Sequence, residues 1–213
     1  MSNWISDREE DKQFIRYMNA LQPKKFLFYL KPPQDFLEQA EEYRQSRGIE
    51  PPKNSHVTLF LFQANPLYSQ RALLNTLDSI AEETPQMIIN MRGWDVFKDI
   101  QTGNDLLVLR AQHAEDLKML HVNIGASIVR PNLYAPTVSG VTEEERLEAV
   151  IEQRYGSRFF GARYHPHMTF GKLKGPKPES DDFHVTWRAD AMYVSVKDNG
   201  WQEIGSFRLA KPF

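Results

Sequence analysis

The sequence predicts a domain of the α+β or α/β class, in which helices cover sheets. Short apolar runs typical of strands alternate with segments whose apolar residues recur at helical spacing. The length of 213 residues is enough for one large domain or for two small lobes with a shared core. No low-complexity tract or linker divides the chain. We therefore expect a single domain over residues 1–213.

The first elements are recognised by the residues that end them. The apolar and aromatic run KFLFYL at 25–30 predicts a buried strand, because two prolines follow directly after Lys31. The charged segment at 35–47 predicts a helix that Gly48 can close. The run SHVTLFLF at 55–62 predicts the second strand.

The middle of the chain continues the alternation. Leucine and isoleucine side chains share one face of the helix expected at 69–83. Strands are expected at 86–97 and 105–111, and the turn that joins them lies near Gly103. A third long helix is expected at 113–129.

The last third of the chain is mostly strand. The segments 164–173 and 183–197 each read as one strand. A hairpin turn at Asp198-Asn199-Gly200 then leads into the last strand at 201–209.

Composition excludes several classes of function. Twenty-six basic and 28 acidic residues give a net charge of −2, which disfavours a strongly basic nucleic-acid wrapper. The chain has no cysteine, which excludes disulfides, thiolate metal sites and cysteine nucleophiles. No apolar run approaches the roughly 20 residues that span a bilayer, and the acidic N-terminus does not read as a targeting signal. We therefore expect a cytoplasmic protein without a membrane partner.

Two tetrapeptides carry the functional signal. HVTL at 56–59 and HMTF at 167–170 both read histidine, any residue, threonine, apolar residue, inside an expected strand. Side chains alternate along a strand, so His56 and Thr58 share one face, as do His167 and Thr169. Six histidines and eight threonines predict about 0.2 such His-x-Thr matches by chance. The chain has three, so the pattern exceeds what composition alone produces.

The third match, HVTW at 184–187, has a different context. Its apolar residues occupy one strand face, which leaves His184 and Thr186 on the other. Nothing around them repeats the surroundings of His56, so we pair His56 with His167 and regard His184 and Thr186 as structural. His113 and His121, near the start of the helix at 113–129 and within it, are expected to be surface or packing residues.

The paired motifs resemble those of the two-histidine (2H) phosphoesterase superfamily, which includes the RNA 2′,3′-cyclic phosphodiesterases also called 2′-5′ RNA ligases. The run KFLFYLKPP, Pro166 before His167 and the final strand-turn-strand add to the resemblance, which covers about Lys25 to Leu209. It implies an α+β fold of two pseudo-symmetric antiparallel-sheet lobes with outer helices and a central cleft. It also implies catalysis without a metal or cofactor.

Two segments look like additions to that fold. Ser6 and the glutamate three positions later have capping-box spacing, which predicts a helix in an N-terminal extension over 1–24. Thr142 begins a second capping box, which predicts a helix inside an insertion over 130–163.

The motif residues suit phosphodiester cleavage. Imidazole has an ordinary pKa near 6.5, so it can act as acid or base at neutral pH. Two histidines facing each other across a cleft can serve both roles, and the hydroxyls of Thr58 and Thr169 can bind the non-bridging phosphoryl oxygens. By family analogy, His167 is the base and His56 the acid when a cyclic phosphate is opened. The roles exchange in the reverse direction, which would join RNA ends.

Weaker candidates flank the motifs. Lys53, Arg163 and Lys172 can attract phosphate, and Tyr164 can stack on a base. The spacing His165-Pro166-His167 is also compatible with two metal ligands on one strand face, although no third ligand is recognisable nearby.

We therefore expect a monomeric phosphodiesterase that acts on a nucleotide or RNA substrate. Candidate linkages are 2′,3′-cyclic phosphates, 2′-5′ oligoadenylates and related cyclic nucleotides or RNA ends. Two alternatives stay open. One is a metal-dependent hydrolase that uses His165 and His167, and the other is a catalytically inactive RNA- or nucleotide-binding module of the same fold.

Overall fold

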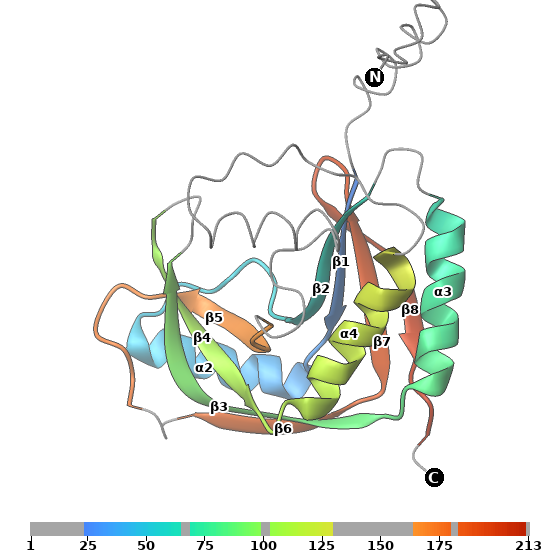
Figure 1. Cartoon of the computed structure of the whole chain (residues 1–213). Helices are drawn as coiled ribbons and strands as arrows, with labels where there is room; N and C mark the ends of the chain where they lie inside the picture. The colour runs from blue at the N-terminus through green and yellow to red at the C-terminus, as the bar shows by residue number, and fades with distance from the viewer. Residues whose placement is uncertain (1–23, 65–68, 99–102, 130–163, 180–182, 212–213) are drawn as a thin grey trace, which may run out of the picture.

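A single antiparallel sheet organises the molecule (Figure 1). The computed structural model describes residues 24–64, 69–98, 103–129, 164–179 and 183–211. Within those ranges, eight strands pair in the order β6-β3-β4-β5-β2-β1-β7-β8, and three helices accompany them. This is an α+β architecture, as expected from the sequence.

The strands are β1 (Lys24–Leu30), β2 (Val57–Ala64), β3 (Met87–Lys98), β4 (Asp105–Gln112), β5 (His167–Lys172), β6 (His184–Ala189), β7 (Ala191–Lys197) and β8 (Trp201–Arg208). The helices are α2 (Gln34–Arg47), α3 (Gln70–Glu83) and α4 (Glu115–Val129).

The sheet has two equivalent halves that meet at β2 and β5. From the middle outwards, one half is β2-β1-β7-β8 and the other is β5-β4-β3-β6. In Figure 1 the half with β3, β4 and β5 lies on the left, and the half with β1, β2, β7 and β8 lies on the right. In each half a helix joins two neighbouring strands, α2 between β1 and β2, and α4 between β4 and β5. One paired position, Val57 with Met168, joins the halves.

Each half builds its own section of the core. Phe26, Phe28 and Phe62 are fully buried on β1 and β2. In this half of the sheet, α3 contacts β8 and α4 contacts β2. In the other half, Phe170 of β5 packs edge-on against Trp94 of β3, with ring centroids 4.8 Å apart. Aromatic pairs in this geometry stabilise beyond their buried area, which favours one fixed arrangement of the sheet.

Local sequence signals fix several element ends as expected. Gly48 ends α2 in the left-handed conformation, with φ of 64°, and its backbone N–H binds the carbonyl oxygens of the last turn. The hydroxyl of Ser69 accepts a hydrogen bond from the backbone N–H of Ala72 and caps α3. The turn before β8 places Asn199 and Gly200 at φ of 48° and 139°, the region that such residues tolerate best.

The expectation of one strand over 183–197 was wrong. The structure divides it at Asp190 into β6, an edge strand beside β3, and β7, which lies between β1 and β8 at the other end of the sheet. The buried positions change parity at this point, because Trp187 and Ala189 are buried before it, whereas Met192 and Val194 are buried after it. A continuous strand cannot keep its buried face through such a switch.

Smaller differences concern element starts, and several expectations are not tested. β5 begins at His167 rather than at 164, and α4 begins at Glu115 rather than at 113. The helices expected in 1–24 and 130–163 lie outside the described residues. Of these two ranges the structure describes Lys24, which begins β1. No helix in the described part of the chain is long and apolar enough to cross a membrane. The cytoplasmic location and monomeric state stay predictions.

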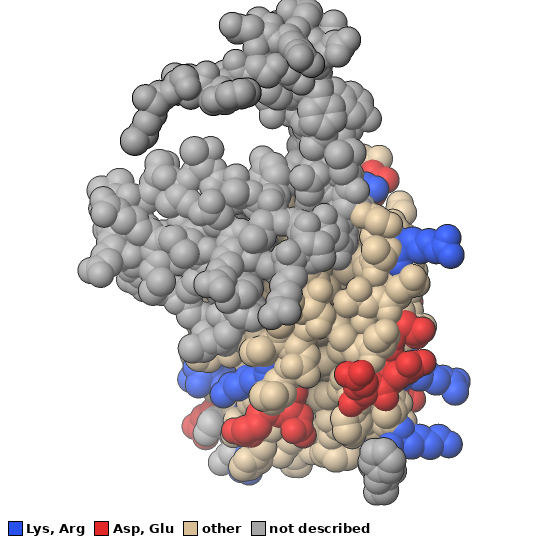
Figure 2. Space-filling model, turned by 45° about the vertical axis from the view of Figure 1, so that its right-hand side comes forward, with Lys and Arg blue, Asp and Glu red and all other residues tan. Residues whose placement is uncertain are grey.

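Charged side chains of both signs are interspersed over the described part of the face drawn in Figure 2. This distribution matches the net charge of −2. An anion site on this molecule therefore depends on individual basic residues rather than on its net charge.

Candidate active site

The two His-x-Thr motifs meet at the centre of the sheet. Val57 and Met168 lie opposite each other across β2 and β5, and both side chains are fully buried in the core. Because side chains alternate faces, the residues on either side of them point to the other face. The pair Val57–Met168 is the one paired position between β2 and β5, so each motif histidine and threonine lies next to this junction in its own strand. The two motifs therefore meet where the two halves of the sheet join.

His167 is held in one ring orientation. Its Nδ1 atom lies 2.7 Å from the backbone carbonyl oxygen of His165. A carbonyl oxygen only accepts hydrogen bonds, so Nδ1 carries the hydrogen and Nε2 of the neutral ring is an acceptor. The ring of Phe97 packs edge-on against the imidazole, with centroids 4.7 Å apart. The tautomer with its hydrogen on Nδ1 leaves Nε2 able to accept a proton, which a general base acting through Nε2 requires.

His56 lies beside a tyrosine that is itself fixed. The ring of Tyr29 meets the His56 ring edge-on, with centroids 5.3 Å apart. The Tyr29 hydroxyl donates to Oε2 of Glu203 at 2.7 Å and lies 3.2 Å from Oγ of Ser195. Lys31 forms an ion pair with the same carboxylate oxygen at 2.6 Å. Burial raises the pKa of Tyr29 to about 12, so its hydroxyl stays protonated at neutral pH.

Both motif histidines favour the neutral form. Burial lowers the pKa of His56, and the nearby charge of His167 lowers it further. Burial also lowers the pKa of His167, and so does the charge of His165, whereas the hydrogen bond to the His165 carbonyl and the charge of Asp95 oppose this effect. The charge of His167 thus reaches His56, and two neighbouring imidazoles on strands that join the halves of the sheet are suited to paired proton transfer.

A cavity of about 500 Å³ adjoins His56. Polar and charged residues in its wall include Tyr29, Lys31, Lys53, Asn54, His56 and Glu203. The sequence identified Lys53 as a residue that flanks the motif, and the structure places it in this wall. Tyr29 and Glu203 were not identified, because both lie far from the motifs in sequence and no local pattern marks them.

The other expected binding residues have different surroundings. Tyr164 is buried, its ring stacks on that of His121 with centroids 4.1 Å apart, and its hydroxyl donates to the Thr58 carbonyl at 2.8 Å. Tyr164 therefore packs against the protein itself, which is the alternative to stacking on a base that its position also allowed. The Lys172 ammonium pairs with Glu50 at 2.8 Å. Arg163 lies outside the described residues.

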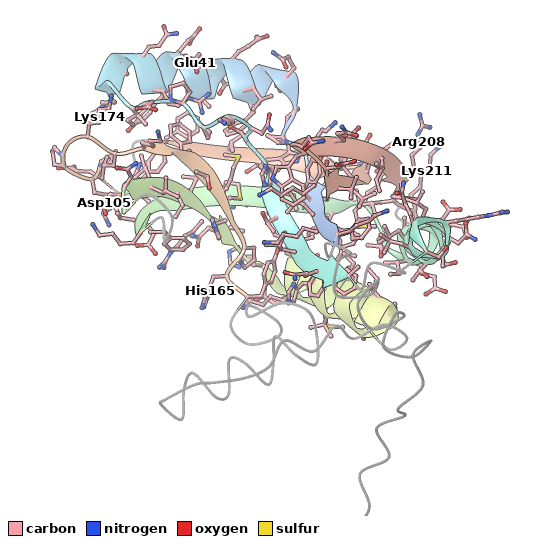
Figure 3. All side chains as sticks on the ribbon, turned by 90° about the horizontal axis from the view of Figure 1, so that it is seen from above. Glu41, Asp105, His165, Lys174, Arg208 and Lys211 are labelled. Carbon is pink, nitrogen blue, oxygen red and sulfur yellow. The ribbon has the colours of Figure 1, made fainter. Side chains whose placement is uncertain are left out.

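The remaining histidines lie apart from this centre. His184 and Thr186 are exposed on the edge strand β6, which β3 and β4 separate from β5. His165 is exposed just before β5 (Figure 3). In the ranges that the structure describes, no three His, Asp or Glu side chains are grouped so as to hold a metal ion. That part of the chain thus supplies no third ligand for His165 and His167.

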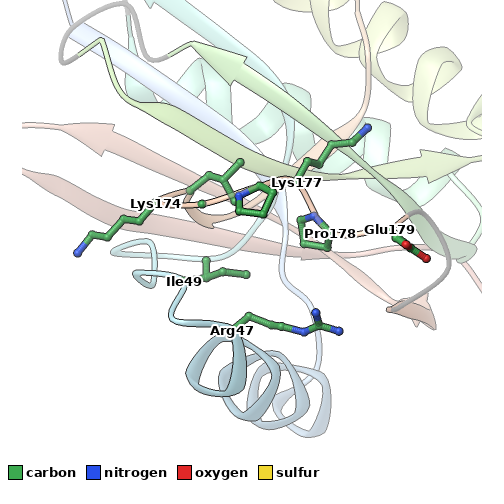
Figure 4. A pocket seen from close by; sticks show the side chains of 9 residues that line it. Arg47, Ile49, Lys174, Lys177, Pro178 and Glu179 are labelled. Carbon is green, nitrogen blue, oxygen red and sulfur yellow. The ribbon is translucent and has the colours of Figure 1, made fainter.

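A second cavity, of about 440 Å³, lies between the end of α2 and the segment after β5 (Figure 4). Its wall includes Arg47, Lys174, Lys177 and Glu179, and neither motif histidine borders it. The motif threonines do not border it either. Of these two cavities in the described part of the chain, the one beside His56 borders a motif residue, and that residue is His56 alone.

Comparison with known proteins identifies the family and the fold. The model of the 2′-5′ RNA ligase superfamily matches residues 32–200, which is most of the chain. The chain belongs to this superfamily. Its fold is that of the two-histidine phosphoesterases, as the motifs implied.

Several solved structures share the fold at low sequence identity. TT0787 of Thermus thermophilus is 19% identical, with a TM-score of 0.59 over 89% of this chain and 100% of that chain. Escherichia coli LigT complexed with NADP+ is 14% identical, with a TM-score of 0.58 over 89% of this chain and 99% of that chain. LigT complexed with 3′-AMP is 14% identical, with a TM-score of 0.55 over 88% and 99% of the two chains. A comparison with curated protein sequences gives no match.

Proposed function

We propose that the chain is a metal-independent phosphodiesterase that cleaves a ribose-phosphate linkage. Candidate linkages are a 2′,3′-cyclic phosphate, a 2′-5′ oligoadenylate and a related cyclic nucleotide or RNA end. The observation that carries the proposal is the pairing of Val57 with Met168, which brings the two His-x-Thr motifs together at the β2–β5 junction. Membership of the superfamily supports the same class of reaction.

His167 is the general base in this proposal. Its Nδ1 atom is occupied by the His165 carbonyl, so Nε2 takes the proton from the attacking water when a cyclic phosphate is opened. The lowered pKa of His167 keeps this nitrogen unprotonated at neutral pH.

His56 is the general acid and protonates the leaving ribose oxygen. Its pKa is lowered in the free protein. The negative charge of a bound phosphodiester favours the imidazolium form. The hydroxyls of Thr58 and Thr169 donate to the non-bridging oxygens and stabilise the charge that develops there. In the reverse direction, the exchange of acid and base roles would join RNA ends.

The cavity beside His56 supplies room for a nucleoside. Its volume of about 500 Å³ lies within the usual range for small-molecule sites, and Lys31 and Lys53 in its wall can attract the phosphate. LigT has been crystallised with NADP+ and with 3′-AMP. A nucleotide substrate for this chain agrees with those complexes.

The test is one panel of assays with EDTA, repeated for the parent without EDTA and with an added divalent ion. The full chain, His56→Ala and His167→Ala are assayed on 2′,3′-cyclic nucleotides, 2′-5′ oligoadenylate and 3′-5′ RNA. The proposal expects turnover of at least one substrate by the parent and a loss of about 10²-fold or more in each variant. His184→Ala is the control and keeps the parent rate.

Other outcomes of this panel identify the alternatives. Activity that EDTA abolishes and a divalent ion restores would indicate a metal-dependent hydrolase. Ligand binding without turnover, unchanged in both alanine variants, would indicate a binding module.

A further inference from the structure

Both motif strands carry a β-bulge at the same motif position. In β2, Tyr29 pairs with Thr58 and Phe28 pairs with Phe60, so Leu59 is an extra residue. In β5, Val108 pairs with Thr169 and Leu107 pairs with Gly171, so Phe170 is an extra residue. Leu59 and Phe170 are each the apolar fourth residue of a motif. A bulge bends its strand and re-aims the neighbouring side chains, which here are the threonine and, two residues earlier, the histidine.

A buried side chain binds the carbonyl oxygen of each bulged residue. Nδ1 of His121 donates to the Leu59 carbonyl at 2.7 Å. The guanidinium of Arg44 donates to the Phe170 carbonyl at 3.2 Å. His121 is 1% exposed and Arg44 is 5% exposed. Apart from tyrosine and tryptophan, the buried polar residues in the described part of the chain are Arg44, His121 and Ser195. Two of these three hold the two bulges.

The support is crossed between the halves of the molecule. α2 joins β1 to β2, yet its Arg44 binds β5. α4 joins β4 to β5, yet its His121 binds β2. Figure 3 shows α2 and α4 on opposite sides of the strands. Each motif strand is therefore fixed by the helix that belongs to the other motif.

Additional contacts hold both supporting side chains in place. Arg44 pairs with Glu41 at 3.0 Å and lies over the Phe170 ring, 5.1 Å from its centroid. His121 stacks on Tyr164, whose hydroxyl binds the Thr58 carbonyl. This carbonyl is adjacent in the chain to the Leu59 carbonyl that His121 binds. Burying such polar groups costs free energy unless they are hydrogen-bonded. Apolar residues would fill these positions at lower cost if packing were their only role.

We propose that His121 and Arg44 are positioning residues that set the two bulges and thereby aim the histidine and threonine of each motif. His121 acts on His56 and Thr58, and Arg44 acts on His167 and Thr169. The inference rests on the proposed function, since it assigns these residues to the same site. A catalytic group displaced by about 1 Å can lose about 10²-fold in rate.

The experiment compares two polar replacements of His121 in the full chain. The amide nitrogen of Asn lies as many bonds from Cβ as Nδ1 of histidine does, whereas that of Gln lies one bond further. His121→Asn therefore keeps the donor to Leu59, and His121→Gln misplaces it. Arg44→Gln removes the guanidinium from the second bulge. His184→Gln, on the exposed edge strand, is the matched control.

Two measurements are made on each variant. The first is kcat and KM on a 2′,3′-cyclic nucleotide, and the second is the set of ¹⁵N imidazole signals of His56 and His167. We expect His121→Gln to lower kcat about 10²-fold with KM nearly unchanged. We expect His121→Asn to retain kcat. The His56 signals should move most in His121→Gln, and the His167 signals should move most in Arg44→Gln.

The inference is overturned if His121→Gln and Arg44→Gln leave kcat and both sets of imidazole signals as in the parent. It is also overturned if His121→Asn loses as much rate as His121→Gln. If neither glutamine variant folds, Tyr164→Phe replaces them, because it removes only the hydroxyl bound to Thr58, and the same displacement of the His56 signals is then required. A parent without turnover of any of the three substrates in the panel above would refute the proposed function, while the imidazole signals would still decide the positioning role.

Discussion

The backbone carbonyl of His165 accepts a hydrogen bond from Nδ1 of His167 at a distance of 2.7 Å. Through this contact, the main chain of His165 selects the tautomer of the His167 imidazole. The exposed His165 thus contributes its main chain to the site, whereas the sequence drew attention to its side chain as a metal ligand. The assignment of His167 as the base depends on this bond and leads to a prediction on pH.

The pH dependence of the rate should be shifted towards acid. Burial lowers the pKa of His167 from its ordinary value of 6.5, so the base stays unprotonated below that pH. We expect the acidic limb of a kcat/KM profile on a 2′,3′-cyclic nucleotide to lie below pH 6.5. An acidic limb above pH 6.5 would contradict this environment for the base.

Stability should also fall in acid. Burial lowers the pKa of His121 in the folded protein below 6.5, its ordinary value in the unfolded chain. Between the folded and the unfolded pKa, the unfolded chain therefore binds more protons than the folded protein. The contribution of His121 to stability is therefore present above pH 6.5 and is lost as the pH falls towards its folded pKa. Urea unfolding at several pH values measures this loss. It should be smaller in His121→Asn, and an equal loss in parent and variant would refute the explanation.

The motif threonines should contribute to rate more than to stability. Thr58→Val and Thr169→Val keep the shape of the side chain and remove a hydroxyl that we assign to a non-bridging oxygen. Loss of one such donor lowers kcat by about 10²-fold. Thr186→Val, on the exposed strand β6, is the control and should keep the parent kcat. Steady-state kinetics decide the matter, and valine variants with parent rates would remove the threonines from the mechanism.

Gly171 is required by a close approach of two backbones. A Cβ atom at this position would lie 2.5 Å from the Glu50 carbonyl oxygen and 2.5 Å from a methyl group of Ile49. Such overpacking costs about 1–3 kcal/mol, so Gly171→Ala should lower the free energy of unfolding by that amount. Gly175→Ala is the matched control, since nothing lies within 4 Å of its added Cβ. Equal stability of both variants in urea would contradict the close approach.

The site could be predicted from the sequence where its signal is local. His56 and Thr58, like His167 and Thr169, are two positions apart, so strand alternation alone places each pair on one face. The resemblance to a known superfamily then paired the two motifs. The division of 183–197 into β6 and β7 also had a local signal, the change of parity between Ala189 and Met192, but the apolar content of the whole segment obscured it.

The supporting residues could not be predicted in this way. Their roles depend on contacts between segments far apart in the chain, such as His121 with Leu59 and Arg44 with Phe170. A bulge becomes visible only when the partner strand and its register are known. For the same reason Tyr164 was expected to meet a base, whereas its hydroxyl binds the Thr58 carbonyl.

The central claim is that His56 and His167 act together on one phosphate. A double-mutant cycle in kcat/KM, measured with EDTA on a 2′,3′-cyclic nucleotide, tests it most directly. We predict that His56→Ala and His167→Ala each lower kcat/KM by about 10²-fold or more. The kcat/KM of the double variant should be only slightly below that of the less active single variant, because the effects of groups that act as a unit are not additive. Single variants with the parent rate, or losses that multiply as for independent sites, would contradict the claim.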